Sequence, residues 1–363
     1  MTPSSKLQTG VAPRAARSVF RLSGRRLRLR TRLLLYRLVE TLRLAEAAGP
    51  SRHGRGVVLC LHNVVQRHGA LGVNRGLDVT TVDLEAIFAC MTARGYTPVS
   101  LDAVSEYLHP ARRSAPRFVA YTFDDGYADN LHVALPLFRR HGIPFTVFVT
   151  TGFMDGAVPV WWYALERKLA AAERVTIPDV DGTLERRTVT IREKVRAYRA
   201  LQAWLVAADA AQRRRLLEAL FGTTPEGGGV GAGDVLSPAE VRTLAEDPLV
   251  TVGAHTRTHA ALRGLPEAEA WREIVESRER LTTLIGRPVD HFAYPFGNPA
   301  ACGPREERLV RQAGFETAVT TAARHVTAAD RATALPRIML SGEYDPARAL
   351  PVLLTDWFGR RRR

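Results

Sequence analysis

Residues 120–126 read Ala-Tyr-Thr-Phe-Asp-Asp-Gly, an apolar run that stops at two adjacent carboxylates and a glycine. The run Phe118–Phe123 predicts a strand that leads directly into Asp124. A second apolar run, Val250–Ala254, is followed at residues 255–259 by His-Thr-Arg-Thr-His. Acidic and imidazole side chains therefore come where two predicted strands end.

The chain alternates predicted strands with predicted helices, which indicates an α/β fold with a parallel sheet. The predicted strands are 57–62, 118–123, 145–150, 250–254, 291–294 and 317–320, and the predicted helices are 82–94, 128–141, 266–285 and 304–313. The Asp and His candidates fall at the carboxyl ends of strands, the face on which α/β barrels carry their chemistry. We therefore expect the functional site on that face.

His255 and His259 are four residues apart, so both rings can face one ion from the same side of a helical or turn-like segment. With Asp125 as a third ligand and one position left open, the set is typical of a catalytic metal site. A divalent ion there lowers the pKa of water and polarises a carbonyl oxygen. Asp124 leaves the strand on the opposite side from Asp125 and is predicted to act as a general base.

Each motif alone has an ordinary structural explanation. Asp-Asp-Gly is usually a turn, in which Asp bonds its own backbone and Gly takes a positive φ. Surface helices also carry His-x-x-x-His pairs by chance. The metal-site prediction depends on finding both motifs at strand ends in one chain.

Three segments resemble the first three motifs of the polysaccharide deacetylases, the NodB-like family 4 of carbohydrate esterases: Thr122–Gly126, His255–His259 and Phe292–Gly297. The resemblance spans residues 55–345. It implies a distorted (β/α) barrel, one divalent metal ion such as zinc (with cobalt, nickel or manganese as alternatives), and removal of acetyl groups from an N-acetylated glycan. By position it makes Asp124 the base, gives Asp125, His255 and His259 to the metal, and assigns Tyr294, Pro295 and Phe296 to the oxyanion and substrate site.

The third motif departs from the family pattern at Ala293, where many members carry an Arg that orients the catalytic Asp. Arg337 is our candidate for that role. The alternative is that Arg337 caps or pairs on the surface.

A second departure concerns the general acid, because many members have a Leu-x-His near the C-terminus and Ile338–Ser341 contains no His. His62 ends the apolar run Val57–His62, and the first and last strands of a closed barrel are neighbours. Family members that act on biofilm poly-N-acetylglucosamine have a similar early His. His62 is therefore predicted to protonate the leaving amine, unless it only bonds a loop carbonyl.

The alternation breaks at residues 155–234, which predict a helix-rich insertion over the site face, with a flexible Gly-rich link at 222–233. Trp162, near its start, is a candidate platform for a sugar ring, although large aromatics more often pack as core. The predicted organisation is a basic N-terminal arm at 1–50, a deacetylase barrel at 51–154 and 235–350, the insertion, and a basic C-terminal tail at 351–363.

The net charge of +14 over 363 residues lies mostly at the two ends of the chain. Residues 1–50 carry 11 Lys and Arg against two Glu, and residues 360–363 are four Arg, which leaves +1 for the rest. No basic stripe on the catalytic domain is implied, so nucleic acid is not an expected partner. Residues 25–44 mix Arg with Leu and fit an amphipathic helix that lies on an anionic membrane; a helix packed on the barrel and a disordered arm are the alternatives.

No cleavable signal peptide is recognised, because the arm has no uncharged apolar run of 7–15 residues. No stretch reaches the ~18 apolar residues of a membrane span. The three Cys are widely spaced and form no disulfide framework, which fits a reducing compartment. We expect a cytoplasmic protein, with membrane association through residues 1–50 left open.

Three other functions remain open. The same metal set could hydrolyse a non-sugar amide or cyclic imide. A catalytically idle glycan-binding protein is favoured by Ala293 and opposed by the intact Asp124. A membrane-docked scaffold for polysaccharide assembly would rest on the N-terminal arm alone.

Overall fold

The computed structural model describes residues 54–109, 116–179, 182–208, 210–222 and 231–355. The predicted arm at 1–50 and residues 356–363 of the predicted tail lie outside the described residues. Within the described part, no helix combines the length and the apolar character that crossing a membrane requires.

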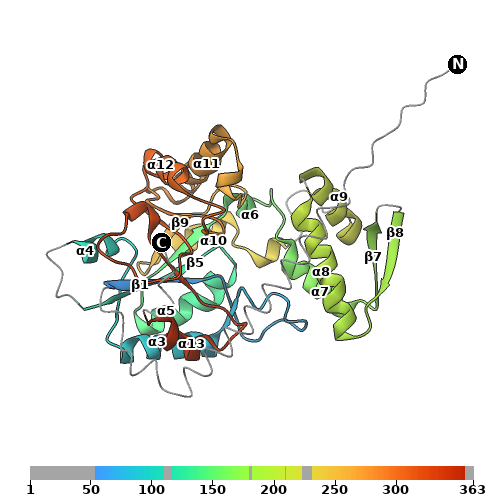
Figure 1. Ribbon diagram of the computed structural model, residues 1–363, viewed down its shortest axis with the longest axis horizontal. Helices are drawn as coiled ribbons and strands as arrows, with labels where there is room; N and C mark the ends of the chain where they lie inside the picture. Colours follow the sequence, from blue (N-terminus) through green and yellow to red (C-terminus); the bar gives the residue numbers. More distant parts are fainter. Residues whose placement is uncertain (1–53, 110–115, 180–181, 209, 223–230, 356–363) are drawn as a thin grey trace. The chain divides into compact units, whose positions relative to one another are not determined.

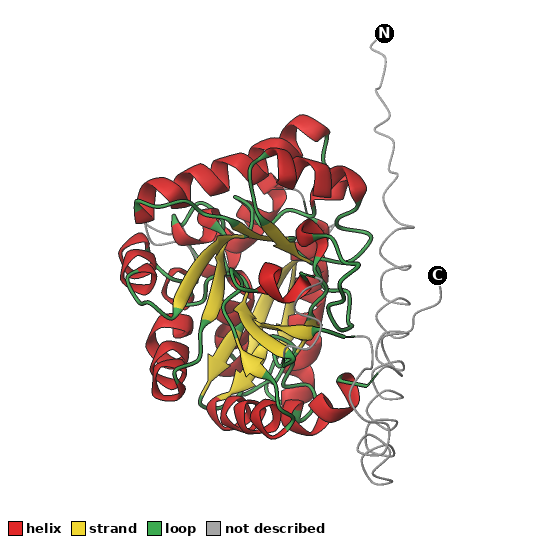
Figure 2. Ribbon diagram, turned by 90° about the vertical axis from the view of Figure 1, so that its left-hand side faces the viewer, coloured by secondary structure: helices red, strands yellow, loops and turns green. Residues whose placement is uncertain are grey.

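A parallel sheet forms the centre of the fold (Figure 1). Its strands run in the order β11-β10-β9-β6-β5-β1-β12, and β4 pairs with the start of β5. The bounds are β1 Gly56–Leu61, β4 Thr97–Pro98, β5 Phe118–Phe123, β6 Phe145–Val149, β9 Val250–Ala254, β10 His291–Ala293, β11 Thr317–Val319 and β12 Ile338–Met339. The sheet curls, with helices packed around its outside (Figure 2), so the predicted distorted barrel is confirmed as a half-barrel.

The first and last strands lie side by side, as a barrel requires. Leu59 pairs with Ile338 and Cys60 with Met339 in parallel register. The same β1 pairs on its other side with β5 along its whole length. The carboxyl ends of β12, β1 and β5 therefore meet, and residues that follow these three strands lie close together.

The outer helices are α3 Thr81–Ala93, α4 Val104–Leu108, α5 Leu135–His141, α6 Thr151–Met154, α10 Pro238–Ala245, α11 Glu267–Ile285, α12 Pro304–Gln312 and α13 Pro346–Leu353. Local sequence sets several of their ends. Ser237 and Glu240 form a reciprocal capping box with Pro238 at the first helical position. Gly142 and Gly286 end α5 and α11 in left-handed conformations that glycine adopts without strain.

The predicted helix at 128–141 divides into a π-helical turn, Asn130–Ala134, and α5. The start of this segment is held by other partners. The Ala128 N–H donates to the Asp234 carbonyl, and the Asn130 side chain donates to the His62 carbonyl. These bonds fix residues 128–130 against neighbouring segments, which explains why a regular helix begins only at Leu135.

Every residue of β1, β5 and β6 is buried, because helices cover the outside of the sheet and side chains fill its inside. Aromatic rings pack between α3, α5 and the sheet, mostly edge to face. Phe88 contacts Tyr121 and Phe138, and Phe138 contacts Phe123 and Phe145. This packing gives the residues after β5 a rigid base.

The insertion forms a separate small core. It contains α7 Trp161–Ala171, the hairpin of β7 Arg174–Asp179 and β8 Gly182–Arg187, α8 Ile191–Ala207 and α9 Ala210–Phe221 (Figure 1). The short strands β2 (Asn63–Val65) and β3 (Asp78–Thr80) pair with each other, and the loop between them touches the insertion. There the buried Glu166 carboxylate accepts hydrogen bonds from the Leu71 N–H and the Asn74 side chain.

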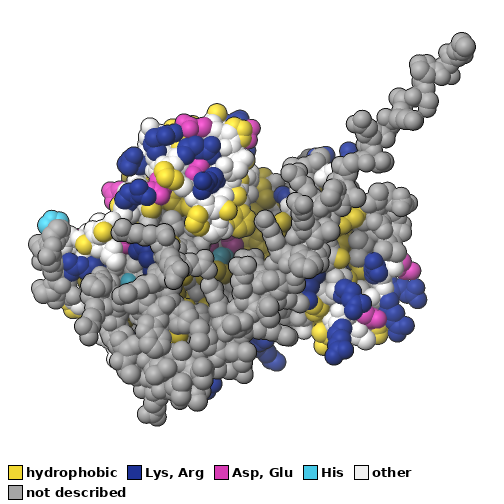
Figure 3. Space-filling model, viewed as in Figure 1, with side chains coloured by type: hydrophobic (Ala, Val, Ile, Leu, Met, Phe, Trp, Pro, Cys, Tyr) yellow, Lys and Arg dark blue, Asp and Glu magenta, His cyan; other side chains and the backbone are white. Residues whose placement is uncertain are grey.

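Charged side chains of both signs alternate over α11 and α12 on the face seen in Figure 3. Ion pairs account for part of this mixture, among them Arg308 with Glu267 and Arg331 with Glu307. Because most of these pairs are exposed, each contributes little to stability. The surface here is mixed in sign rather than a field of one charge.

Candidate active site

The two carboxylates of the first motif lie at the carboxyl end of β5. The Asp124 N–H donates to the Leu61 carbonyl of the neighbouring β1 at 3.0 Å, which continues the ladder by one residue. The chain then turns sharply, because Asp125 has φ 75° and Gly126 has φ 73°. Left-handed backbone at a non-glycine residue is uncommon. Because β5 ends at Phe123, the direction of the Asp125 side chain is set by this turn rather than by the alternation of side chains along a strand.

Asp125, His255 and His259 come together at one point. The Asp125 Oδ1 atom lies 3.5 Å from His255 Nε2 and 3.2 Å from His259 Nε2. Candidate ligand atoms of all three residues lie within 4.8 Å of one another. Asp125 Oδ1 is buried and has no hydrogen-bond donor among the described residues. A buried acceptor facing two imidazole nitrogens fits a divalent cation of the zinc type.

The backbone determines which His255 nitrogen faces this point. His255 Nδ1 lies 2.7 Å from the Ala293 carbonyl oxygen. A carbonyl oxygen only accepts hydrogen bonds, so Nδ1 carries the hydrogen. Nε2 therefore presents its lone pair to the candidate metal site that His255 forms with Asp125 and His259. The position where the family Arg is missing thus supports a candidate metal ligand, His255, through its main chain.

Burial and neighbouring charges shift the pKa values of His255 and Asp125 in opposite directions. Burial lowers the pKa of His255 to about 4, more than the nearby carboxylates raise it, which keeps the ring neutral. Burial raises the pKa of Asp125, but the charges of the surrounding His residues outweigh it and the pKa is lowered. His255 and Asp125 therefore have the protonation states that metal binding needs. His259 differs: burial lowers its pKa, but the Asp125 and Asp124 carboxylates outweigh burial and raise the pKa above its ordinary value.

Arg337, immediately before β12, is fully buried against Asp124. Its Nη1 and Nη2 atoms each lie 2.6 Å from one Asp124 carboxylate oxygen. The same guanidinium donates to the Thr320 carbonyl and the Thr122 hydroxyl. Burial raises the pKa of Asp124, but the Arg337 charge outweighs it and lowers the pKa to about 2. Asp124 is therefore ionised and held in one orientation by a bidentate pair.

We expect Arg337→Lys to lower turnover about 10- to 100-fold while leaving metal content unchanged. Lysine keeps the charge but has no planar fork to hold both Asp124 oxygens. The magnitude is that of a lost supporting contact. Acetate release and metal analysis on the same preparation measure both quantities.

A matched control is Arg324→Lys, which alters the bidentate Arg324–Asp330 pair elsewhere in the molecule. Its turnover should stay near that of the parent. Equal losses in the two variants would contradict a specific role for Arg337.

His62 lies next to Asp124 in a second cluster of candidate ligand atoms. One candidate ligand atom each of Cys60, His62 and Asp124 lies within 4.8 Å of the others. His62 Nδ1 is buried without a hydrogen-bond partner among the described residues. The Arg337 guanidinium already neutralises Asp124 here, so a cation is favoured at the Asp125 point rather than at this second cluster.

The third motif contributes one rim of the site. Phe296 has φ 62°, and its exposed ring lies 4.9 Å from the His259 ring. The Phe296 N–H has no acceptor among the described residues, whereas its carbonyl accepts from the Thr321 hydroxyl. Tyr294 points elsewhere: its hydroxyl is buried and donates to the Thr333 carbonyl. Pro295 links the two, and nothing more is shown about its role.

Trp162 is only partly buried, at the first turn of α7. Its ring packs edge to face on Trp161 and Phe153, and its Nε1–H donates to the Tyr127 hydroxyl. Packing therefore accounts for much of this side chain. Its predicted role in stacking on a sugar stays a prediction.

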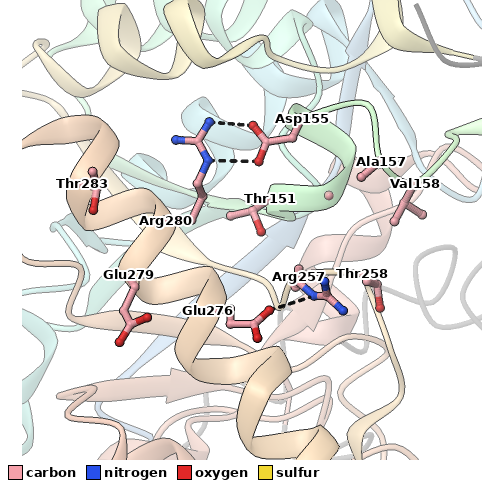
Figure 4. Close-up of a pocket in the computed structure, with 11 residues that line it drawn as sticks. Thr151, Asp155, Ala157, Val158, Arg257, Thr258, Glu276, Glu279, Arg280 and Thr283 are labelled. Carbon is pink, nitrogen blue, oxygen red and sulfur yellow. Dashed lines mark hydrogen bonds and ion pairs between the residues drawn. The ribbon is translucent and has the colours of Figure 1, made fainter. Parts of the chain in front are cut away.

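The His255–His259 loop is held from its outer side by α11. The buried Glu273 carboxylate accepts from both the N–H and the hydroxyl of Thr258, each at 2.8 Å. Further out, Arg257 and Thr258 line a pocket of about 600 Å³, in which Arg257 pairs with Glu276 and Arg280 pairs with Asp155 (Figure 4). The loop needs this support, because His259 itself has φ 59°.

The model of one protein family, described as polysaccharide deacetylase, matches residues 111–318, more than half of the chain. The chain belongs to the polysaccharide deacetylase family. It is thus a deacetylase, a hydrolase of carbon–nitrogen bonds other than peptide bonds, and the resemblance inferred from the three motifs is confirmed. No curated protein sequence matches it.

Solved structures of low sequence identity share the fold. The deacetylase PplD of Streptococcus pyogenes, in complex with acetate, is 16% identical with a TM-score of 0.54, over 82% of this chain and 97% of that one. IcaB from Ammonifex degensii is 17% identical with a TM-score of 0.53, over 84% and 99%. The deacetylase domain of BpsB from Bordetella bronchiseptica is 16% identical with a TM-score of 0.50, over 80% and 98%.

Several supports of the site could not be found from the sequence. The Ala293 carbonyl acts through its backbone, and Glu273 lies in an ordinary amphipathic helix. Cys60 stands in an apolar run of the sequence, and its Sγ lies 3.5 Å from Asp124 Oδ2. Only the placement of Cys60 two residues before His62 in the same strand carried a signal, since alternate residues of a strand face the same side.

Proposed function

We propose that this protein is a metal-dependent deacetylase that removes N-acetyl groups from a glycan. The observation that carries the proposal is that the two adjacent carboxylates have different partners. Asp125 faces two imidazole nitrogens, whereas both oxygens of Asp124 are held by Arg337. A divalent cation held by Asp125, His255 and His259 would activate water and polarise the acetyl carbonyl.

The protein's own groups supply the proton transfers. Asp124 is ionised and accepts the proton of the attacking water, and Arg337 keeps its carboxylate oriented during the reaction. The Phe296 N–H, on a left-handed backbone, is the proposed donor to the developing oxyanion. His62 donates a proton to the departing amine, so the products are acetate and a free amino sugar.

His62→Ala is expected to lower kcat about 10²- to 10⁴-fold, the usual contribution of a general acid. Metal content should be unchanged, since His62 lies on the Asp124 side of the site. The measurement is acetate release with saturating substrate, together with metal analysis. Near-normal turnover at full metal content would remove the assignment and leave His62 a structural residue.

Acetate release from a panel of N-acetylated sugars and oligosaccharides tests the function itself. The same panel includes small cyclic imides and non-sugar acetamides, which the metal set could also hydrolyse. Activity on glycans that is lost with a chelator and restored by Zn²⁺ supports the proposal. Turnover of imides alone would replace it, and full glycan binding without acetate release would indicate an idle binding protein.

A further inference from the structure

The insertion reaches the proposed metal site through the first turn of α7. The Trp162 Nε1–H donates a hydrogen bond of 3.0 Å to the Tyr127 hydroxyl. Tyr127 is fully buried and follows Asp125 by two residues. Burial and, after it, the charge of the Asp125 carboxylate raise the pKa of the Tyr127 hydroxyl, so the two groups lie close together. A residue of the insertion is thus one side chain removed from a proposed metal ligand.

The number of hydrogens and lone pairs on each group determines which group donates in this chain of contacts and which accepts. An indole N–H only donates, an ionised carboxylate only accepts, and a tyrosine hydroxyl has a single hydrogen to give. With Trp162 occupying the acceptor side of the Tyr127 oxygen, the hydroxyl hydrogen is available to Asp125. The indole therefore sets the orientation of the hydroxyl, and the hydroxyl restrains the carboxylate.

The segment that directly follows the insertion holds the same loop through its backbone. The Leu236 N–H donates to the Gly126 carbonyl, and Tyr127 forms an antiparallel bridge with Val235. Arg167 on α7 forms a bidentate pair with Asp234, at 2.8 Å for both bonds. The two ends of the insertion are thereby joined to each other as well as to the loop that carries Asp125.

A second metal ligand is reached from the same indole. The Phe153 ring stacks on the His259 ring at 5.7 Å with an interplanar angle of 25°. The Phe153 ring also contacts the Trp162 ring edge to face, with the ring centroids 5.8 Å apart. Trp162 therefore touches the neighbours of two ligands that come from different strands.

We propose that the insertion positions the metal site, with Trp162 directing the Tyr127 hydroxyl onto Asp125. Both are positioning residues, because they act through Asp125 rather than on the substrate. This inference rests on the proposed metal-dependent function. It differs from a role for Trp162 in sugar stacking, because it predicts an effect on metal affinity rather than on KM.

The test uses the full chain, with Trp162→Phe, Tyr127→Phe and the double variant. Phenylalanine at 162 keeps an aromatic ring against Phe153 and removes the N–H donor. Metal-free protein is titrated with Co²⁺, followed by visible absorption and by chelator competition. Each single variant should weaken Co²⁺ affinity about 10-fold, at the low end of the ~10–100-fold cost of losing such a support.

The double variant should bind Co²⁺ no more weakly than Tyr127→Phe, because both changes act through one hydroxyl. Trp204→Phe is the matched control within the insertion, since Trp204 lies on α8 and its side chain is 40% exposed. Its Co²⁺ affinity should equal that of the parent. KM for glycan at saturating metal should be unchanged in all variants.

If Trp162→Phe binds Co²⁺ with unchanged affinity, the inference is overturned, whether or not its KM for glycan is raised. The proposed function stands in that case. Additive losses in the double variant overturn the inference as well. If Trp162→Phe does not fold, Tyr127→Phe decides, because it lacks a single oxygen atom. A parent protein that takes up neither Co²⁺ nor Zn²⁺ removes both this inference and the metal-dependent function.

Discussion

Asp124→Asn is expected to reduce acetate release by at least 10³-fold while the protein still binds its metal. The amide cannot accept a proton at neutral pH, and a positioned general base contributes about 10²- to 10⁴-fold. The substitution also turns an –NH₂ group toward the Arg337 guanidinium, which in the parent protein donates to both Asp124 oxygens at 2.6 Å. Loss of orientation therefore adds to loss of the base.

Stability should fall in the same variant, because Arg337 is fully buried and Asp124 is its carboxylate partner. Removing one partner of a buried ion pair costs about 3–5 kcal/mol. Thermal unfolding measures this loss, and turnover is therefore assayed well below the lowered melting temperature. Metal content of the same preparation then separates a missing base from a damaged site.

Asp330→Asn is the matched control. Asp330 also holds an Arg through both oxygens, and its pKa is likewise lowered, with the Arg324 hydrogen bond and charge outweighing burial. It lies in the loop that follows His325, where it also accepts from the Thr327 N–H. Its loss should reduce stability without affecting turnover. A parallel loss of turnover in both variants would point to general destabilisation and contradict the role of Asp124 as the base.

The strands that carry the site were predictable because they are apolar runs with a sharp end. Phe118–Phe123 and Val250–Ala254 form β5 and β9 at the predicted residues. Their motifs fixed the order of ligands along the chain, and the parallel arrangement placed them on one face. The short elements were not predicted, since β12 has two residues and α6 has four, too few for a periodic pattern.

Contacts between distant segments were predicted only where strand order determined them. Because β1 pairs with β5 on one side and with β12 on the other, His62 and Arg337 both come close to Asp124, and neighbouring first and last strands were expected of a barrel. The Glu273 support of the His255–His259 loop does not follow from any pattern. It depends on how a surface helix is rotated against a loop, which tertiary packing sets rather than local sequence.

Asp125→Ala and His255→Ala are expected to lose the metal and, with it, all measurable turnover. Each removes one of three protein ligands whose candidate atoms lie within 4.8 Å of one another. Affinity should therefore drop by more than the ~10–100-fold that follows loss of a supporting contact. Zn²⁺ bound per chain, measured after dialysis and by competition with a chromogenic chelator, gives the size of the effect.

His291→Ala separates loss of a ligand from loss of a buried imidazole. His291 is buried in β10, where its two ring nitrogens contact Thr317 and Asp102 at 2.7 Å, and it has no part in the metal cluster. Its removal should lower stability by about 1–3 kcal/mol through the unpaired groups left behind, with Zn²⁺ stoichiometry unchanged. If both Asp125→Ala and His255→Ala keep one Zn²⁺ per chain at parental affinity, the cation binds elsewhere. The proposed separate roles of Asp124 as base and Asp125 as metal ligand would then have no chemical basis.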